Sequence, residues 1–245
     1  MGNKNFNIEN KKIIICTFPK RGNHDFSDFF PKGETTIINF PLIETKAINF
    51  QFPNPVEKYD WIIFTSKNAI EPFFNKAGKT SNKIAAIGKG TYEELKNFGY
   101  NVNFTGKGFS AVYFLKELKN IIHPGQKILL ALGNLAPETL QQNLSTEHFV
   151  ERVNVYKTQR TKNVDSSVIK RINEDRYGVI LVTSPSAVYH IFSLIPDKPL
   201  RLISIGETTT KAIKEYDTEP VSTAIIPGYS ELAEAAMTFL SIGKR

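Results

Sequence analysis

Four short turns in this chain carry hydroxyl side chains and glycines of the kind that bind anions. Each turn lies between an apolar run and a helical pattern, so its hydroxyls adjoin the unpaired N–H groups of a helix start. Such groups suit carboxylates or phosphates as ligands. The residues concerned are Thr65, Ser66, Lys67 and Asn68 in the first turn, Gly88 and Thr91 in the second, Thr183, Ser184 and Ser186 in the third, and Gly206, Thr208 and Thr209 in the fourth.

The four turns form two pairs, because the middle of the chain contains two copies of one sequence pattern. The segment 60–70 returns at 177–188, and the segment 84–91 returns at 202–209. In both pairs the second copy follows the first by 118 residues. A third repeated segment, 108–110, returns 120 residues later at 228–230. The sequence therefore predicts two copies of one structural unit.

Several common catalytic arrangements are missing from the sequence. It has neither the GxxxxGK[ST] phosphate loop nor the GxGxxG dinucleotide fingerprint, and no Ser-His-Asp, Cys-His or paired-carboxylate arrangement recurs in the turns. The four histidines are scattered without metal-ligand spacing, and the single cysteine, Cys16, lies in an apolar run typical of a core. The residues show no metal site, and an enzyme built from these turns would work mainly by holding and orienting its substrate.

Composition places the chain among ordinary globular proteins, with 41% hydrophobic and 22% charged residues. The net charge of +7 is spread along the chain, so it fits an anionic small molecule or simply a solvated surface, and not nucleic acid. No apolar run approaches the roughly 20 residues that span a bilayer. The N-terminus carries no apolar signal core, and we therefore expect a cytoplasmic protein without a membrane partner.

Short β-branched runs alternate with helical patterns along the chain. Most of the runs lack period-two alternation, as strands covered on both faces do, and the alternation of strand and helix predicts an α/β fold with a parallel sheet. The expected strands are 12–16, 34–39, 61–64, 83–87, 101–104, 127–132, 151–156, 178–182, 201–205 and 221–226, and the expected helices are 68–76, 91–98, 111–119, 137–144, 166–173, 186–194, 209–216 and 231–240.

Cap residues mark where several of these helices should begin. Thr91 opens a capping box, and Ser184-Pro185 places an N-cap hydroxyl before a proline at the first helical position. Ser110 and Ser230 likewise precede apolar helical runs. A cap role alone would account for each of these hydroxyls, so the sequence leaves open whether they also bind a ligand.

The domain boundaries follow from the repeat. The second copy begins near residue 177 and lacks an opening strand, which the N-terminal run 12–16 can supply. One domain should therefore be continuous and the other built from both ends of the chain. The expected domains are 45–152 and 1–39 plus 160–245, with connectors at 40–44 and 153–159.

The repeated turns and the segment between them form an ordered set of motifs. The set is FTSKNAI at 64–70, AIGKGT at 86–91, VNVYKT at 153–158, TSPSAV at 183–188 and SIGETT at 204–209. This order resembles the uroporphyrinogen-III synthase family, from about residue 12 to the C-terminus. The resemblance implies two similar flavodoxin-like parallel-sheet domains, one of them discontinuous, joined by a two-stranded connector, and it implies no cofactor.

The resemblance also implies a reaction and roles for individual residues. The family cyclises hydroxymethylbilane, a linear tetrapyrrole with eight carboxylate arms, with loss of water and inversion of ring D, which gives uroporphyrinogen III for haem, sirohaem and cobalamin biosynthesis. Tyr156 matches the family tyrosine that is thought to assist loss of the terminal hydroxyl. The family pattern is not followed at Phe18, where many members have arginine, or at Lys67, where proline is usual, although Lys67 could still meet a substrate carboxylate.

Two other functions fit parts of the pattern. A two-domain α/β binding protein for a small anionic ligand would use the same turns without chemistry, but the VNVYKT segment favours the synthase. A sugar-nucleotide or phosphoryl transferase would need a diphosphate-binding glycine pattern or metal carboxylates. We therefore expect a cyclising hydro-lyase that acts on a small molecule as a monomer.

Overall fold

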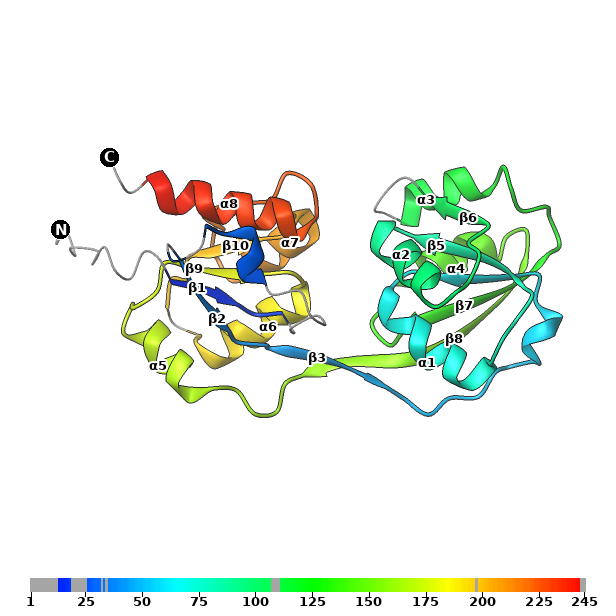
Figure 1. Cartoon of the computed structure of the whole chain (residues 1–245), viewed down its shortest axis with the longest axis horizontal. Coiled ribbons are helices and arrows are strands. Elements are labelled where there is room, and N and C mark those ends of the chain that lie inside the picture. The colour runs from blue at the N-terminus through cyan, green and yellow to red at the C-terminus, as the bar shows by residue number, and fades with distance from the viewer. Residues whose placement is uncertain are drawn as a thin grey trace. The chain divides into compact units, whose positions relative to one another are not determined.

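The chain divides into two compact units, and each unit has its own sheet (Figure 1). The computed structural model describes residues 13–18, 26–31, 33, 35–106, 111–196 and 198–242. Unit 1 comprises Met1–Glu44 and Gln159–Arg245, and unit 2 comprises Thr45–Thr158. Ser110 and the rest of the repeated segment 108–110 lie outside the described residues.

Unit 2 is built on a six-stranded sheet of order β3-β8-β7-β4-β5-β6. The strands β4 to β8 pair in parallel, so their carboxyl ends lie at one edge of the sheet. Its strands are β3 (Ile43–Ala47), β4 (Trp61–Phe64), β5 (Lys83–Ile87), β6 (Phe104–Gly106), β7 (Lys127–Gly133) and β8 (Phe149–Arg160), and its helices are η3 (Val56–Lys58), η4 (Lys67–Ala69), α1 (Ile70–Ala77), α2 (Lys89–Asn97), α3 (Ala111–Leu118) and α4 (Thr139–Leu144).

Unit 1 is built on a five-stranded sheet of order β11-β10-β9-β1-β2, in which all neighbours pair in parallel. Its strands are β1 (Ile13–Cys16), β2 (Thr36–Asn39), β9 (Val179–Val182), β10 (Leu202–Ser204) and β11 (Ser222–Thr223), and its helices are η2 (Phe26–Phe29), α5 (Ser166–Asn173), α6 (Pro185–Leu194), α7 (Glu207–Lys214) and α8 (Tyr229–Ile242). None of the helices in the described part of the chain is long and apolar enough to cross a membrane.

The two sheets repeat one arrangement of strands. In unit 2, β5 and β6 lie on one side of β4, and β7 and β8 lie on the other. In unit 1, β10 and β11 lie on one side of β9, and β1 and β2 lie on the other. The N-terminal strand β1 thus takes the place beside β9 that β7 takes beside β4, and the sequence repeat corresponds to a repeat of topology.

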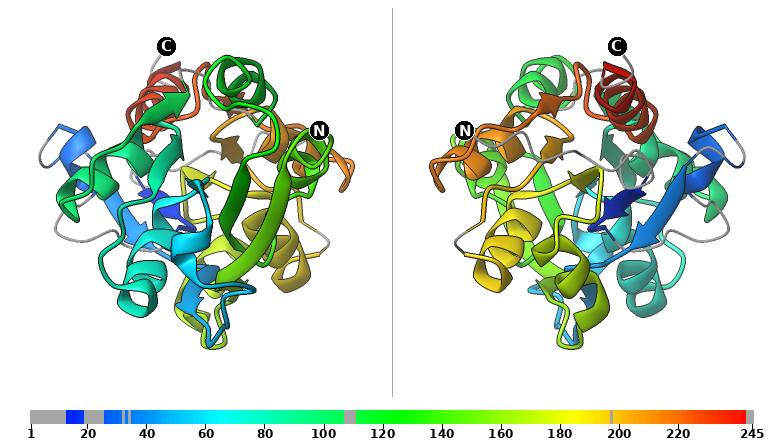
Figure 2. Two further views of the ribbon diagram at one scale, coloured as in Figure 1. Left: turned by 90° about the vertical axis from the view of Figure 1, so that its right-hand side faces the viewer. Right: turned by 90° about the vertical axis from the view of Figure 1, so that its left-hand side faces the viewer.

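Both sheets are covered by helices on their two faces, as the apolar strands predict. In unit 2, Phe64 packs with residues of α1 and α2, whereas Ile63 packs with residues of α3 and α4. In unit 1, Ile15 packs with α5, α6 and α7, and Cys16 packs with α8. Figure 2 shows the helices on either side of the strands. Cys16 is fully buried, which confirms its interpretation as a core residue.

Three local expectations were wrong. The strand expected at 101–104 lies instead at Phe104–Gly106 (β6). The strand β3, which pairs with β8, was not among the strands expected from the residue pattern, although the resemblance implies a two-stranded connector at this place. Thr91 is not a cap, because the positive φ of Gly88 (80°) makes the turn by itself and α2 begins at once, at Lys89. Ser230 lies inside α8, which begins one residue earlier, at Tyr229.

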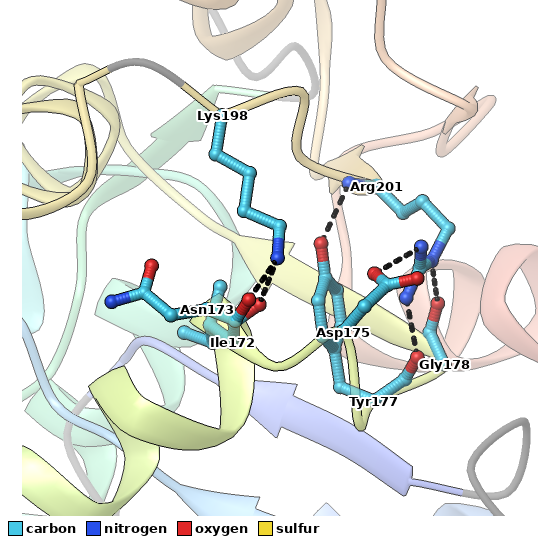
Figure 3. A network of polar contacts seen from close by, with 7 residues as sticks. All are labelled: Ile172, Asn173, Asp175, Tyr177, Gly178, Lys198 and Arg201. Atoms are coloured by element: carbon cyan, nitrogen blue, oxygen red, sulfur yellow. Dashed lines mark hydrogen bonds and ion pairs between the residues drawn. The ribbon is translucent and has the colours of Figure 1, made fainter.

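A largely buried arginine joins the amino ends of β9 and β10 (Figure 3). The guanidinium of Arg201 donates to the carbonyl oxygens of Gly178 at 2.8 Å and Tyr177 at 2.5 Å, and it pairs with Asp175 at 2.8 Å. Its Cζ lies 4.1 Å from the centroid of the Tyr177 ring. Burial raises the pKa of the Tyr177 phenol, and the charge of Arg201 opposes this shift. The network stabilises the edge of the sheet opposite to the polar turns.

Candidate active site

The first polar turn follows β4 at the carboxyl edge of the unit 2 sheet. Ser66 is the N-cap of η4, and its hydroxyl accepts a hydrogen bond from the backbone N–H of Asn68 at 3.3 Å. A hydroxyl that accepts a bond keeps its own hydrogen as a donor. Thr65 and Lys67 flank Ser66 and are partly exposed. The turn therefore combines a helix cap with side chains that can contact a ligand.

The second polar turn follows the neighbouring strand, β5. Gly88 is the N-cap of α2, and its φ of 80° is a conformation that favours glycine. An added Cβ would meet no atom within 4 Å, so the backbone conformation, not space, requires this glycine. Thr91 lies in the first turn of α2 and is only 6% exposed. Because β4 and β5 are parallel neighbours, both turns lie at the same edge of the sheet.

Unit 1 repeats the first turn after β9. Ser184 is the N-cap of α6, and its hydroxyl accepts from the backbone N–H of Ala187 at 3.3 Å. Thr183 and Ser186 beside it are partly exposed. The cap that Ser184-Pro185 predicts is thereby confirmed, and it matches the cap that Ser66 forms in unit 2.

Unit 1 repeats the second turn after β10, with one difference. Thr209 is 3% exposed, as buried as its counterpart Thr91. Gly206 is the N-cap of α7, but its φ of 167° is extended backbone that other residues adopt. An added Cβ would instead lie 3.2 Å from a side-chain carbon of Pro227. Thr208 is exposed on the first turn of α7.

A cavity of about 320 Å³ in unit 2 brings three of the predicted residues together. They are Lys67 and Asn68 of the first turn and Tyr156 of β8. Thr65, Ser66, Gly88 and Thr91 do not line it. The remaining lining residues are Thr45, Lys46, Ala47, Glu71, Pro72, Asn75 and Glu94.

The cavity carries charges of both signs. Lys46 and Lys67 supply ammonium groups that attract carboxylates, and Glu71 and Glu94 supply carboxylates of their own. The sequence analysis missed Lys46, Glu71 and Glu94. Lys46 lies on β3, a strand that no apolar run marks. The two glutamates lie on helices, where their spacing does not differ from that of ordinary solvent-exposed charges.

Tyr156 is held at the cavity by β7. It is half-buried and packs against the core cluster that includes Val153 and Val155. Its backbone carbonyl accepts a hydrogen bond from the backbone N–H of Asn134 at 3.1 Å. The ring lies over Gly133, which pairs with Tyr156 in the sheet. The neighbouring strand therefore holds the backbone of Tyr156, and the residue lines the cavity.

A second cavity of about 350 Å³ lies at the amino ends of β7 and β8 and contains none of the predicted residues. In it, the Tyr59 hydroxyl donates to Glu151 at 2.5 Å, and the Asn54 amide donates to the same carboxylate oxygen at 2.9 Å. Burial, followed by the bond to Glu151, raises the pKa of Tyr59 to about 12. The protonated phenol is a structural donor there, and the polar turns lie at the other edge of the sheet.

This shift of the Tyr59 pKa predicts a loss of stability in alkali. The unfolded tyrosine ionises near pH 10 while the folded one resists, so its contribution is complete below pH 10 and is lost as the pH rises towards about 12. Tyr59→Phe should flatten the fall of the unfolding free energy between about pH 10 and 12, relative to the parent. Urea denaturation at several pH values measures this difference, and parallel curves for the two proteins would contradict it.

These features define an α/β protein with parallel sheets, whose polar turns lie beyond the carboxyl ends of the strands, where such sheets commonly bind ligands. The family description "Uroporphyrinogen-III synthase HemD" matches residues 32–234. The chain therefore belongs to the uroporphyrinogen-III synthase family, an enzyme family of tetrapyrrole biosynthesis.

Individual relatives agree with this assignment. The uroporphyrinogen-III synthase of Chlorobaculum parvum is 23% identical over 233 residues, which are 89% of this chain and 94% of the relative. The crystal structure of the uroporphyrinogen-III synthetase of Helicobacter pylori matches 93% of this chain and 99% of its own, at 16% identity and a TM-score of 0.66. A substituted uroporphyrinogen III synthase from Thermus thermophilus matches 94% and 99%, at 14% identity and a TM-score of 0.61. At such identities the structural matches establish the fold.

Proposed function

We propose that this chain converts hydroxymethylbilane into uroporphyrinogen III, closing the linear tetrapyrrole with loss of one water and inversion of ring D. The observation that carries the proposal is the family match over residues 32–234, which includes every residue of the Tyr156 cavity. The net charge of +7 attracts a substrate with eight carboxylates. Helix starts and hydroxyls at the sheet edges supply donors for those carboxylates.

Tyr156 is the proposed proton donor of the first step. The bond between the terminal methylene carbon and its hydroxyl oxygen breaks, and the oxygen leaves as water with a proton from the phenol. The ring A nitrogen gives up a proton as the electrophilic azafulvene forms, and it regains a proton when ring D attacks the methylene carbon. The final closure releases a carbon-bound proton from ring D, which restores the phenol, so only water is lost overall.

The turns are proposed to steer the second step. Ring D attacks the azafulvene through its substituted carbon and forms a spiro intermediate, which breaks and recloses with ring D inverted. Uncatalysed closure gives the I isomer, so the protein must hold the carboxylate arms in the productive fold of the chain. Lys67 and Asn68 line the same cavity as Tyr156, and we propose that they hold an arm near the reacting end.

Phe18 takes no part in this proposal. Its side chain is 6% exposed, and its ring packs edge-on against Phe26 at 5.1 Å and Tyr229 at 5.0 Å. Where many family members have an arginine, this chain has a core aromatic. Binding of the carboxylates must therefore rely on other groups.

The proposal extends to the domains. We propose two flavodoxin-like domains, at 1–39 plus 160–245 and at 45–152, linked by 40–44 and 153–159. Counted in its own chain order, the unit 1 sheet has the strand order 2-1-3-4-5, which is the flavodoxin order. The division of the chain after Glu44 and after Thr158, inside β3 and β8, supports links at these places.

The product isomer tests the proposed function. The purified chain is incubated with hydroxymethylbilane, the product is oxidised, and the uroporphyrin isomers are separated by chromatography. We expect the III isomer in excess over a protein-free control. Accumulation of the I isomer alone, at the rate of the control, would contradict the proposal.

No single hydroxyl of the turns should be indispensable. Ser66→Ala removes one donor and one cap, while the backbone N–H groups of the turn remain. We expect KM to rise roughly 10-fold, with kcat nearly unchanged, and stability to fall by about 1 kcal/mol. Steady-state kinetics and thermal unfolding measure both effects.

Ser66→Thr is the matched control, since threonine keeps both the hydroxyl and the cap, and it should behave like the parent. Ser184→Ala should repeat the loss of stability, because Ser184 caps α6 in the same way. Abolished turnover in a folded Ser66→Ala protein would show a dedicated catalytic serine in place of a distributed site.

A further inference from the structure

The sheet pairing changes register beside Tyr156. Leu132 of β7 pairs with Asn154 of β8, but the next residue, Gly133, pairs with Tyr156, so Val155 is the extra residue of a bulge. A bulge re-aims the side chains that follow it. In a regular strand Tyr156 would point away from the core cluster that holds Val155, yet its ring packs against that cluster. The bulge therefore turns Tyr156 to the face of the sheet that carries α1 and the cavity.

Gly133 leaves room for the tyrosine ring. A Cβ at residue 133 would lie 2.7 Å from both Cε2 and the hydroxyl oxygen of Tyr156, and closer still to Cζ. Distances below 3 Å do not occur for real Cβ atoms, so the ring would have to move. The φ of Gly133 is not in the positive range, so its backbone does not require glycine. What requires glycine here is the phenol tip, the part of Tyr156 that would do the chemistry.

The backbone around Gly133 cannot easily shift to relieve such a clash. Arg152 donates to the carbonyl oxygens of Gly133 and Ala136, each at 3.0 Å. Asn134 donates from its backbone N–H to Tyr156, and its side-chain oxygen accepts from the backbone N–H of Thr158 at 2.8 Å. These bonds hold the end of β7 and the β8 segment together on both sides of the bulge. A side chain at residue 133 would therefore displace the ring instead of the strands.

We propose that Gly133 is a positioning residue for Tyr156: its lack of a side chain forms the seat that holds the phenol at the cavity. This inference rests on the proposed role of Tyr156 as proton donor. It adds a residue that touches no substrate and lies outside the repeated motifs. Its effect on the reaction runs entirely through Tyr156.

The test compares Gly133→Ala in two backgrounds. In the parent, kcat should fall roughly 10- to 100-fold while KM changes less than about 3-fold, since displacement of a catalytic group by about 1 Å costs up to 10²-fold. In Tyr156→Phe, where no phenol remains to be displaced, the same substitution should leave the residual kcat unchanged. An equal fractional loss in both backgrounds, or no loss in the parent, would overturn the inference.

Stability measurements keep the test decisive if Gly133→Ala folds poorly. In the Tyr156→Ala background, where the clash is absent, Gly133→Ala should cause no further fall of the melting temperature beyond that of Tyr156→Ala alone, and a further fall as large as in the parent would overturn the inference. Gly106→Ala is the matched control, since its Cβ would lie 2.7 Å from the Phe114 ring and away from Tyr156. It should lower stability and leave kcat unchanged well below the melting temperature. A wrong assignment of Tyr156 as proton donor would give a different result from a wrong role of Gly133, because Tyr156→Phe itself would then keep the parental kcat.

Discussion

Tyr156→Phe should lower kcat for uroporphyrinogen III formation by about 10²- to 10⁴-fold, the usual contribution of a general acid. The substitution removes one oxygen and its proton and keeps the ring that packs against Val153 and Val155. The fold and the seat over Gly133 should therefore survive, and the melting temperature should stay within about 2 °C of the parent. KM should change little, because the phenol is proposed to act on the departing hydroxyl and not on a carboxylate arm.

Tyr113→Phe is the control for the loss of a tyrosine hydroxyl. Tyr113 is 64% exposed on α3 and does not line the Tyr156 cavity, so its variant should keep the parental kcat. Single-turnover kinetics with isomer analysis separates the chemical step from product release. A parental kcat in Tyr156→Phe would reassign Tyr156 to packing, and the proton would then have to come from another group of the cavity, such as Glu71 or Glu94.

The parallel sheets were predictable from local sequence because buried parallel strands are apolar runs between helical patterns. Trp61–Phe64 and Lys83–Ile87 have the bounds that the sequence predicts. By contrast, the residue pattern did not mark β3, because Ile43–Ala47 is polar and largely exposed and becomes a strand only through its pairing with β8; only the two-stranded connector implied by the resemblance pointed to it. That pairing joins residues far apart in the chain: the side chains of Gln159 and Glu44, which bond to each other, lie 115 positions apart. No short sequence window contains that information.

The same distinction between local sequence and long-range contacts applies to the candidate site. The caps at Ser66 and Ser184 are local, so residue types and spacing predict them. Thr91 was misjudged because the conformation of one glycine decides where α2 begins. The seat of Tyr156 depends on a bulge and on a glycine from another strand, and no motif marks either. The sequence alone therefore predicts which side chains are available, whereas the contacts show which of them share a cavity.

The largest expected effect on stability concerns Arg201, which joins the amino ends of β9 and β10. Its side chain is 18% exposed, and it donates to the carbonyl oxygens of Gly178 and Tyr177 while it pairs with Asp175. Arg201→Met keeps most of the volume but leaves two backbone carbonyls and a carboxylate without their donor. We expect the free energy of unfolding to fall by about 2–4 kcal/mol, because each lost bond to a charged group is worth roughly 1.5–3 kcal/mol and water replaces part of it.

Arg201→Lys distinguishes the loss of charge from the loss of the guanidinium fork. Lysine restores a cation but cannot donate to two carbonyls and a carboxylate in one plane, so it should recover less than about half of the lost stability. Arg176→Met is the matched control: Arg176 pairs with Glu174 at 2.6 Å, but its side chain is 50% exposed, and removing such a pair should change stability by less than about 1 kcal/mol. Urea denaturation gives the three values. If Arg201→Met and Arg176→Met unfold at the same urea concentration, the network does not stabilise unit 1. The contacts of Arg201 in Figure 3 would then be no more favourable than the contacts that the same groups make with water in the unfolded chain.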